Sequence, residues 1–529
     1  MALSSKDIHF SQIPATNIQR SVFDRSHTYK TTFDAGYLVP FYLDEVLPGD
    51  SFKIKATTFA RLNTPIVPFM DNLYLDTQFF FVPTRLLWKH WKEFNGERKK
   101  PTDSIDFTIP KFANGTSFAV GSLGDYFGLP TGVALNNVNS LPFRAYNLIY
   151  NEWYRDENLI DSVYFDDGDS DDSLSNYSLL KRCKRHDYFT SCLPWPQKGD
   201  SVDIPLGELA PIVTSVPNND TGFVMNLTKD NPLQPTYKQA TIGISSSHPT
   251  FAVPNYTNGS ANVFADLSNA TAATINSLRQ AFQVQRMLER DARGGSRYTE
   301  IIRSHFGVVS PDARLQRPEY LGGSSNRITI NPVVQTSSTD SVSPQGNLSA
   351  FGVSGNTSNN MSRSFTEHGY IIGLVSVRAD LTYQQGLNRL WSRRTRYDFY
   401  WPSLAHLGEQ AVLNKEIYAQ ADTVVDSDGN VVNDQVFGYQ ERYAEYRYFP
   451  NQITGKFRST YSTPLDVWHL AQKFTTLPVL GQTFIEENPP LDRVVSVPSE
   501  PDILFDSLVS VKAARPMPVY GVPGLIDHF

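Results

Sequence analysis

The stretch KTTFDAGYLVPFYLDEVLPGDSFKIKATTFARL, residues Lys30–Leu62, decides the fold. Apolar and polar residues alternate along it in short runs, and a period of two predicts β-strands that bury one face. The runs are broken at Gly36, Pro40, Pro48 and Gly49, where proline presets φ and glycine accepts a positive φ. The stretch therefore predicts strands joined by tight turns.

Similar patterns extend over the rest of the chain. The run YIIGLVSVRADLTY, within His368–Tyr383, is nearly continuous in apolar residues and is typical of a strand buried on both faces. Ser337–Ser364 is predicted to be a polar loop, and Val424–Val432 a hairpin tip. Further strands are predicted at Leu73–Pro83, Arg327–Gln335 and Ile503–Tyr520. Many strands with helices confined to connections indicate one antiparallel β-sandwich with large insertions.

One long helix is predicted within Phe264–Gly323, with Ser268 or Asn269 as N-cap and Gly294-Gly295 as its end. One side is apolar and predicted to be buried, and the other side is a cationic stripe. The apolar side holds Ile275, Leu278, Ala281, Phe282, Val284 and Leu288, and the stripe holds Arg279, Gln283, Arg286, Arg290 and Arg293. The stripe fits a solvated surface, a subunit contact or a nucleic-acid contact.

Shorter helices are predicted at Leu86–Phe94, Phe143–Glu157 and Tyr298–Phe306. Residues 1–27 are predicted to form an extended arm, residues 201–263 a large surface insertion, and residues 515–529 a C-terminal tail.

Composition narrows the class of protein. The 529 residues include 40% hydrophobic residues, with 33 Phe and 26 Tyr, which is ample for a core and favours strands. The net charge of −7 argues against a free-standing nucleic-acid binder. Two cysteines, Cys183 and Cys192, are too few for a disulfide scaffold and indicate folding in a reducing cytoplasm. We expect a chain without membrane insertion, because no apolar run is long enough to span a bilayer.

The search for catalytic and metal-binding motifs finds no complete signature. Ser178 and Lys181 match S-x-x-K without its accompanying elements. The acidic loop Asp166–Asp172 resembles the start of a calcium loop, but Asp172 and Ser178 stand where an EF-hand needs Gly and Glu. We predict a solvated acidic loop there, with an adventitious cation as the alternative. No catalytic residue, cofactor or metal is predicted.

Basic residues interleaved with aromatic ones give a stronger signal. Guanidinium–phosphate pairing with base stacking, about 1–3 kcal/mol per base, is typical of single-strand binding. The same residue types are favoured in large protein–protein interfaces. Subunit interface, DNA contact and plain surface therefore remain open. The candidates are Arg389, Trp391, Arg393, Arg394, Arg396, Tyr397, Tyr400 and Trp401 in one segment, Arg442, Tyr443, Tyr446, Arg447, Tyr448, Phe449, Lys456, Phe457 and Arg458 in another, and the charged run Lys181, Arg182, Lys184 and Arg185.

Long, idiosyncratic stretches carry a family resemblance. They are Phe23–Asp50, Asp71–Trp91, Ala265–Gly323, Glu367–Gln420, Gly438–Tyr448 and Ala514–Phe529. In these stretches the chain resembles the major capsid proteins of the Microviridae, small single-stranded DNA phages, in their gokushovirus branch. Residues 201–263 match no fixed pattern of that family.

The resemblance implies a mainly β, eight-stranded antiparallel jelly roll with long insertions that carry helices. It implies sixty copies in a T=1 icosahedral shell around circular single-stranded DNA, assembled in the cytoplasm of a bacterial host. Residues 201–263 would form a protrusion near each three-fold axis that contributes to attachment to a host receptor. The implied virion partners are a small basic DNA-associated protein and a pilot or minor protein. The alternative from the residues alone is a carbohydrate-binding or carbohydrate-active β-sandwich.

Overall fold

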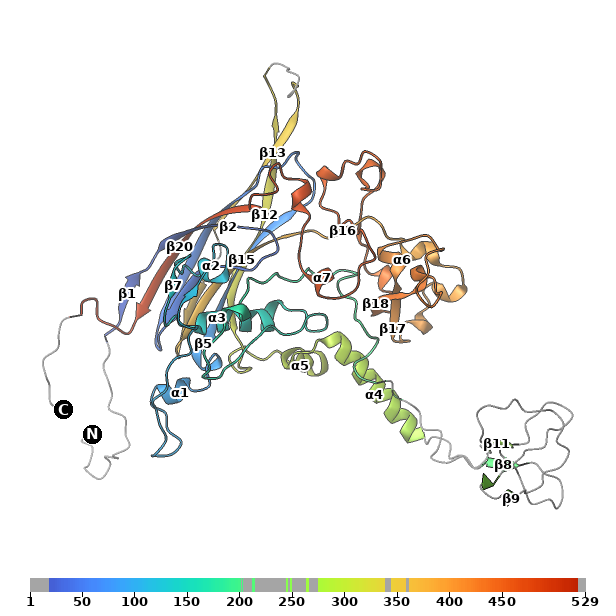
Figure 1. Cartoon of the computed structure of the whole chain (residues 1–529), viewed down its shortest axis with the longest axis horizontal. Coiled ribbons are helices and arrows are strands. Elements are labelled where there is room, and N and C mark those ends of the chain that lie inside the picture. Colours follow the sequence, from blue (N-terminus) through green and yellow to red (C-terminus); the bar gives the residue numbers. More distant parts are fainter. Residues whose placement is uncertain are drawn as a thin grey trace. The chain divides into compact units, whose positions relative to one another are not determined.

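The computed structural model describes residues 19–200, 202, 212–214, 244–245, 248–249, 263–265, 275–337, 344–357 and 361–521. The chain divides into two compact units, one formed by Met1–Pro196 with Ala292–Phe529 and the other by Gln197–Asp291. The first unit contains the main sheet (Figure 1).

The main sheet consists of two four-stranded halves, all of whose strand pairs are antiparallel. The first half has the order β2 (His27–Phe33), β20 (Ile503–Arg515), β4 (Ser51–Leu62) and β13 (Leu348–Thr357). The second half has the order β3 (Val39–Val46), β15 (Gly369–Ala379), β5 (Leu73–Pro83) and β12 (Glu319–Val334). Short strands β1 (Ser21–Asp24) and β14 (Met361–Ser364) extend the first half on β20 and β4.

Strand β12 joins the two halves. Its first part, Glu319–Ile328, pairs with β5, and its last part, Thr329–Val334, pairs with β13. Along the chain, β2, β3, β4 and β5 alternate between the halves, and so do β12, β13, β15 and β20. This alternation defines a jelly roll, so the predicted antiparallel jelly roll with long insertions is confirmed.

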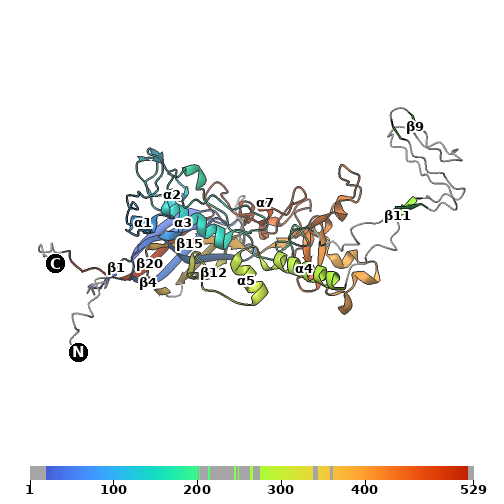
Figure 2. The same ribbon diagram turned by 90° about the horizontal axis from the view of Figure 1, so that it is seen from below.

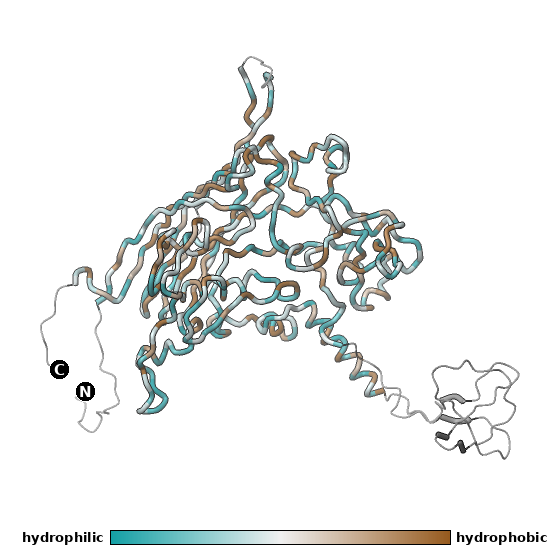
Figure 3. The backbone as a smooth tube through the Cα atoms, in the orientation of Figure 1, coloured by the Kyte–Doolittle hydropathy of each residue, from teal (hydrophilic) through white to brown (hydrophobic). Residues whose placement is uncertain are grey.

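The core between the halves is aromatic at its centre. The Phe41 ring lies 5.5 Å from the Phe79 ring and 5.7 Å from the Phe505 ring, in edge-to-face contacts that join β3, β5 and β20. Burial alternates residue by residue along β4 and β20, as their sequence pattern predicts. Figure 3 shows the corresponding alternation of hydropathy along the strands.

A second apolar layer covers the outer face of β5 and β15. It is built mainly from residues 87–180 of the long insertion between β5 and β12, around α3 (Leu141–Ile149) and the π-helical turn Tyr150–Tyr154. Every residue of β15 is buried, which confirms the prediction of a strand covered on both faces. Figure 2 shows α3 over β15. Short elements of this insertion are α1 (Trp91–Phe94), β6 (Thr116–Ser117), α2 (Leu123–Tyr126), β7 (Ala134–Leu135) and α5 (Tyr298–Phe306).

A third apolar cluster lies around the hairpin of β17 (Glu409–Leu413) and β18 (Val436–Glu441), and it joins residues 188–192 to residues 381–484. Helix α6 (Asn414–Ile417) follows β17 directly, and its Ile417 is part of the cluster. Other short elements here are β16 (Thr382–Tyr383), β19 (Asn451–Gln452) and α7 (Gln482–Ile485). The smaller unit holds β8 (Ile212–Thr214), β9 (Ile244–Ser245), β10 (His248–Pro249), β11 (Val263–Ala265) and most of α4 (Ile275–Gly294).

Several local predictions are confirmed. Helix α5 has the predicted bounds, and Val425 bridges Val431 at the predicted hairpin tip. Helix α4 ends at Gly294, and Gly295 takes a φ of 97° there. The predicted N-caps of α4, most of the insertion 201–263, residues 1–18 of the arm and residues 522–529 of the tail lie outside the described residues.

Two local predictions are wrong. Ser337–Ser364 is not simply a loop, because it contains β13 and β14. Small residues occupy inward positions of β13, such as Ala350 and Gly352, and they hide the alternation. The apolar side of α4 is only partly covered: Ile275 is 70% exposed and Phe282 is 62% exposed, whereas Leu278, Ala281, Val284 and Leu288 are half-buried. An amphipathic pattern shows that a side prefers to be covered, but it does not say by which surface.

We predict that Phe505→Ala lowers the free energy of unfolding by about 3–5 kcal/mol, because it empties the aromatic centre of the core. The matched control is Phe351→Ala, on the exposed face of β13, for which we expect a loss below about 1 kcal/mol. Urea unfolding of the two full-length variants measures the difference. Equal losses would contradict the assignment of this core.

A partly buried carboxyl, that of Asp502, lies where the end of β2 meets the start of β20. Asp502 accepts a hydrogen bond from the Ala35 amide at 3.0 Å, and Asp34 accepts one from the Asp502 amide at 3.2 Å. Burial raises the pKa of Asp502 to about 6, and the neighbouring Asp34 and Asp492 add to the shift. The folded state therefore binds this proton more tightly than the unfolded chain does.

From that shift we predict that stability falls as pH rises from about 4 to about 6, because the carboxyl ionises in the unfolded chain first. Asp502→Asn keeps the acceptor for Ala35 and should flatten this part of the pH profile. Asp506→Asn, on the exposed face of the same strand, is the control. Thermal unfolding across this pH range measures both; a profile unchanged by Asp502→Asn would refute the prediction.

Candidate interaction surface

The structure brings the two predicted basic and aromatic segments together beside the β17–β18 hairpin. Residues 388–401 run through short 3-10 turns, and residues 442–449 follow the end of β18. We call the combined region the aromatic–basic surface. It consists of Arg389, Trp391, Arg393, Arg394, Arg396, Tyr397, Phe399, Tyr400, Trp401, Arg442, Tyr443, Tyr446, Arg447, Tyr448 and Phe449.

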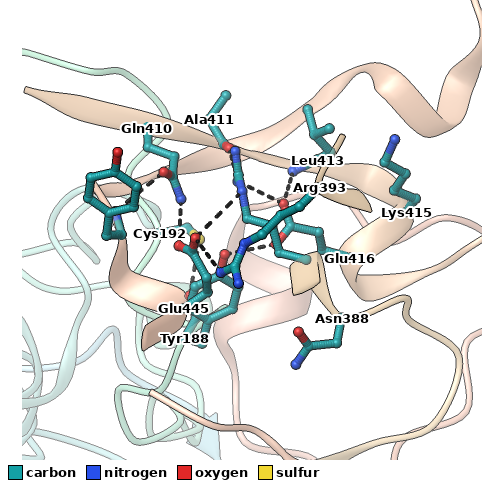
Figure 4. A network of polar contacts seen from close by, with 12 residues as sticks. Tyr188, Cys192, Asn388, Arg393, Gln410, Ala411, Leu413, Lys415, Glu416 and Glu445 are labelled. Atoms are coloured by element: carbon teal, nitrogen blue, oxygen red, sulfur yellow. Dashed lines mark hydrogen bonds and ion pairs between the residues drawn. The ribbon is translucent and has the colours of Figure 1, made fainter. Parts of the chain in front are cut away.

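Two buried carboxylates hold this surface from beneath. Glu445 accepts from Arg393 at 3.2 Å and from the Gln410 side chain at 2.9 Å. Glu416 accepts from Arg389 at 3.0 Å and from the Tyr188 hydroxyl at 2.8 Å. Figure 4 shows these contacts converging from the hairpin, α6 and the segment that contains Arg393. Both carboxylates are almost fully buried, so their cations are fixed in place.

The electrostatics of Glu416 depend on its cation. Burial raises the pKa of the Glu416 carboxyl, and the Arg389 guanidinium opposes that shift. The Tyr188 hydroxyl donates a hydrogen bond to this carboxylate, and burial raises the pKa of that phenol. Arg389 and Glu416 therefore form an ion pair with a structural role, and the Glu416 carboxylate is shielded from water.

Above the carboxylates, guanidinium groups stack on aromatic rings. The Arg393 guanidinium lies 4.2 Å from the Tyr446 ring centre, and that of Arg396 lies 4.7 Å from Trp401. Tyr443 takes a positive φ of 63°, and its buried ring packs edge-on against Tyr400 at 5.2 Å. Its hydroxyl donates to the Phe399 carbonyl at 3.1 Å, which holds this strained residue in position.

The outer rings of the surface face solvent. Trp391 is 74% exposed, Phe449 is 71% exposed and Tyr397 is 67% exposed, and Phe399, Tyr400, Trp401, Tyr446 and Tyr448 are exposed too. Such a concentration of exposed large apolar groups marks an interaction site. A cavity of about 220 Å³ lies at the foot of the surface, lined by Arg393, Tyr397 and Arg442 among others.

The predicted site residues are only partly available for a ligand. Arg389 and Arg393 are paired with buried carboxylates, and Arg447 pairs with Glu441. The Nε atom of Arg442 is buried without a hydrogen-bond partner. Arg279, Arg286 and Arg290 lie exposed on α4 in the smaller unit. Glu416 and Glu445 could not be predicted from the sequence, because neither lies at a recognisable spacing from the arginine with which it pairs.

The charged run Lys181–Arg185 does not form a cationic patch. Arg182 pairs with Asp76 at 2.7 Å, and Lys184 donates to the Phe484 carbonyl at 2.5 Å. Burial lowers the pKa of Lys184 to about 8. Arg182 therefore holds its insertion against the sheet, and Lys184 joins that insertion to the segment that contains Phe484.

The prediction that Asp166–Asp172 is a solvated loop is wrong at Asp172, which is buried in an ion pair with Arg144 at 2.8 Å. Asp169 is exposed as predicted, although it accepts a hydrogen bond from the Trp88 indole at 2.7 Å. Arg144 and Trp88 could not be predicted as partners of this loop, because they lie far from it along the chain. In the described part of the chain, no three His, Cys, Asp or Glu side chains are grouped to hold a metal ion.

Two-sheet jelly rolls build viral capsids, lectins and cupins, and the uncovered aromatic–basic surface fits the shell-forming class. The family model described as Capsid protein (F protein) matches residues 11–525. Capsid protein VP1 of Chlamydia phage 1 is 47% identical over 582 residues, covering 98% of this chain and 97% of its own length.

Two further relatives are similar over their whole length. Capsid protein VP1 of Bdellovibrio phage phiMH2K is 49% identical over 536 residues, covering 98% of both chains. Capsid protein VP1 of Spiroplasma virus 4 is 37% identical over 555 residues, covering 99% of this chain and 98% of the relative. The chain belongs to the Capsid protein (F protein) family, and it is a structural capsid protein of a phage of the Microviridae. None of the helices in the described residues is long and apolar enough to cross a membrane.

We predict that Glu445→Ala destabilises the aromatic–basic surface by about 3 kcal/mol or more, because Arg393 and Gln410 lose their shared acceptor. Hydrogen exchange of amides in residues 442–449 should become faster. The control is Arg447→Ala, which breaks an exposed ion pair and should cost below about 1 kcal/mol. Unchanged exchange in Glu445→Ala would show that the buried network does not hold this surface.

Proposed function

We propose that identical copies of this chain assemble through the aromatic–basic surface into a closed icosahedral shell. The shell has T=1 symmetry with sixty copies and encloses circular single-stranded DNA. The observation that carries the proposal is the set of exposed rings around Trp391, Tyr397 and Phe449, which a single chain leaves uncovered. Obligate interfaces bury 2,000–5,000 Å² or more and are enriched in aromatic residues and arginine.

Charge pairing favours a protein partner over DNA at this surface. Arg389 and Arg393 are neutralised by carboxylates of the same chain. A phosphate would have to compete with Glu416 and Glu445 for these two arginines. Preformed ion pairs and fixed rings instead reduce the entropy that a protein interface loses when it forms. The predicted DNA contact through Arg393 is therefore the weaker interpretation.

The remaining partners are those that the family resemblance implies, and the charge of the chain supports the first of them. A chain with a net charge of −7 needs a separate cation source to package DNA, which a small basic DNA-associated protein supplies. A pilot or minor virion protein completes the particle, and assembly takes place in the cytoplasm of a bacterial host. Residues 201–263 form the three-fold protrusion and contact the host receptor. Residues 1–27 and 515–529 serve as interior or inter-subunit contacts.

We predict that the double variant Trp391→Ala/Tyr397→Ala folds normally but forms few or no shells, because both rings are exposed in the single chain. The variant is expressed with the phage's other proteins, and shells are counted by electron microscopy and sedimentation. The control, Val120→Ala/Val479→Ala, removes apolar groups that are equally exposed elsewhere. Shells at the normal yield in Trp391→Ala/Tyr397→Ala would refute this interface.

A further inference from the structure

The two halves of the jelly roll differ in what covers their outer faces. The outer face of β5 and β15 lies beneath the apolar layer around α3. On the other half, the outward residues of β4 and β20 alternate with buried ones and are exposed. This face carries an excess of cations, and we call it the basic sheet face. Its cations are Lys30, Lys53, Lys55, Arg61 and Lys512.

The strand register places like charges side by side. Lys53 of β4 is directly opposite Lys512 of β20, and Lys55 is two residues further along the same face. Like charges directly opposite each other destabilise a sheet. Within the described residues, none of these three lysines forms an ion pair, although Asp24 is opposite Lys512 on its other side. The arrangement costs stability in the isolated chain, and an external anion would reverse that cost.

A groove lies at the other end of the same face. It has a volume of about 670 Å³, and its lining includes Lys30, Phe59, Arg61, Leu504 and Asp506. The Arg61 guanidinium lies 5.1 Å from the Phe59 ring centre, and the ring is 38% exposed. A cation beside an open aromatic ring can bind a phosphate and stack a base.

The acidic side chains of this face are fewer than its cations. Asp506 is opposite Lys30, Asp24 accepts a hydrogen bond from the Ser26 hydroxyl, and Asp125 also lines the groove. At the margin, Glu319 is paired with Arg363 at 3.0 Å. The five cations therefore exceed the acids that face them, in a chain whose net charge is −7. This excess distinguishes the basic sheet face from the aromatic–basic surface, where carboxylates of the chain already neutralise Arg389 and Arg393.

We propose that the basic sheet face binds single-stranded DNA. Phosphates contact Lys53, Lys55 and Lys512, and the strand continues to the groove, where a base stacks on Phe59 beside Arg61. From Lys53 to Arg61 the path along β4 is about 26 Å, at ~3.3 Å per residue, which accommodates several nucleotides. The inference rests on the proposed function, since it names the surface of the capsid subunit that meets the genome.

The test measures DNA binding apart from shell formation. Purified full-length subunits are titrated with labelled oligo(dT), and fluorescence anisotropy is followed over a range of salt concentrations. The variant Lys53→Gln/Lys55→Gln/Lys512→Gln should lose about tenfold or more in affinity at moderate salt. The slope of log affinity against log salt should fall by about 2, because each lost phosphate contact removes about 0.7. Phe59→Ala should weaken binding with little change in slope.

The matched control, Lys92→Gln/Lys99→Gln/Lys100→Gln, removes the same charge from exposed lysines of the insertion and should leave affinity and slope near those of the unmodified chain. Equal losses in both triple variants would overturn the inference, because they would reflect net charge alone. The inference would also be overturned if Lys53→Gln/Lys55→Gln/Lys512→Gln bound DNA normally but no longer formed empty shells. That result would identify the basic sheet face as a contact between copies of the chain. Failure of the unmodified chain to form shells would count against the proposed function only, since the titration reads DNA binding separately.

Discussion

The structure depends on one constraint, the hydrogen bonding of β12 to both halves of the sheet. The strand pairs with β5 through its first part and with β13 through its last part. The halves therefore enclose one core, in which Phe41 contacts both Phe79 and Phe505. Once the strand ends are held in this way, long insertions cost little, because the entropy of closing a loop grows only slowly with its length. The insertions accordingly contribute apolar clusters beside the main core, one mainly from residues 87–180 and one that joins residues 188–192 to residues 381–484.

Much of the sheet could be predicted because its signals are local. Alternation revealed β4 and β20, and a continuous apolar run revealed β15. Strand β13 was missed because small inward residues weaken the pattern. For the aromatic–basic surface, the interleaved basic and aromatic residues indicated two candidate interaction segments. The structure shows that these segments meet beside β18. Composition could not indicate Glu416 and Glu445, because an ion pair between residues distant in sequence leaves no spacing to recognise.

The molecule uses its cations in two ways. Arg389, Arg393 and Arg447 of the aromatic–basic surface are paired with carboxylates of the chain, and the paired Arg393 also stacks on Tyr446. Lysines of the basic sheet face have no such partners in the described residues, so their charge extends into solvent. Planar guanidinium groups suit fixed contacts with carboxylates and rings, whereas a lysine ammonium is a mobile point charge. Arginine is thus used where the contacts are fixed, in the aromatic–basic surface, and lysine where the contacts can adapt to a ligand, on the basic sheet face.

A capsid subunit cannot reach its lowest free energy alone if its surfaces are shaped for partners. Exposed rings such as Trp391 gain free energy only when another surface covers them. Lys53 and Lys512 repel each other across the strands although Asp24 lies opposite Lys512 on its other side, and a bound anion would reduce that repulsion. Both features lower the stability of the single chain and raise the free energy gained on association. Assembly covers the exposed rings, and genome binding reduces the repulsion between the lysines. Each step therefore removes an unfavourable free energy that the single folded chain retains.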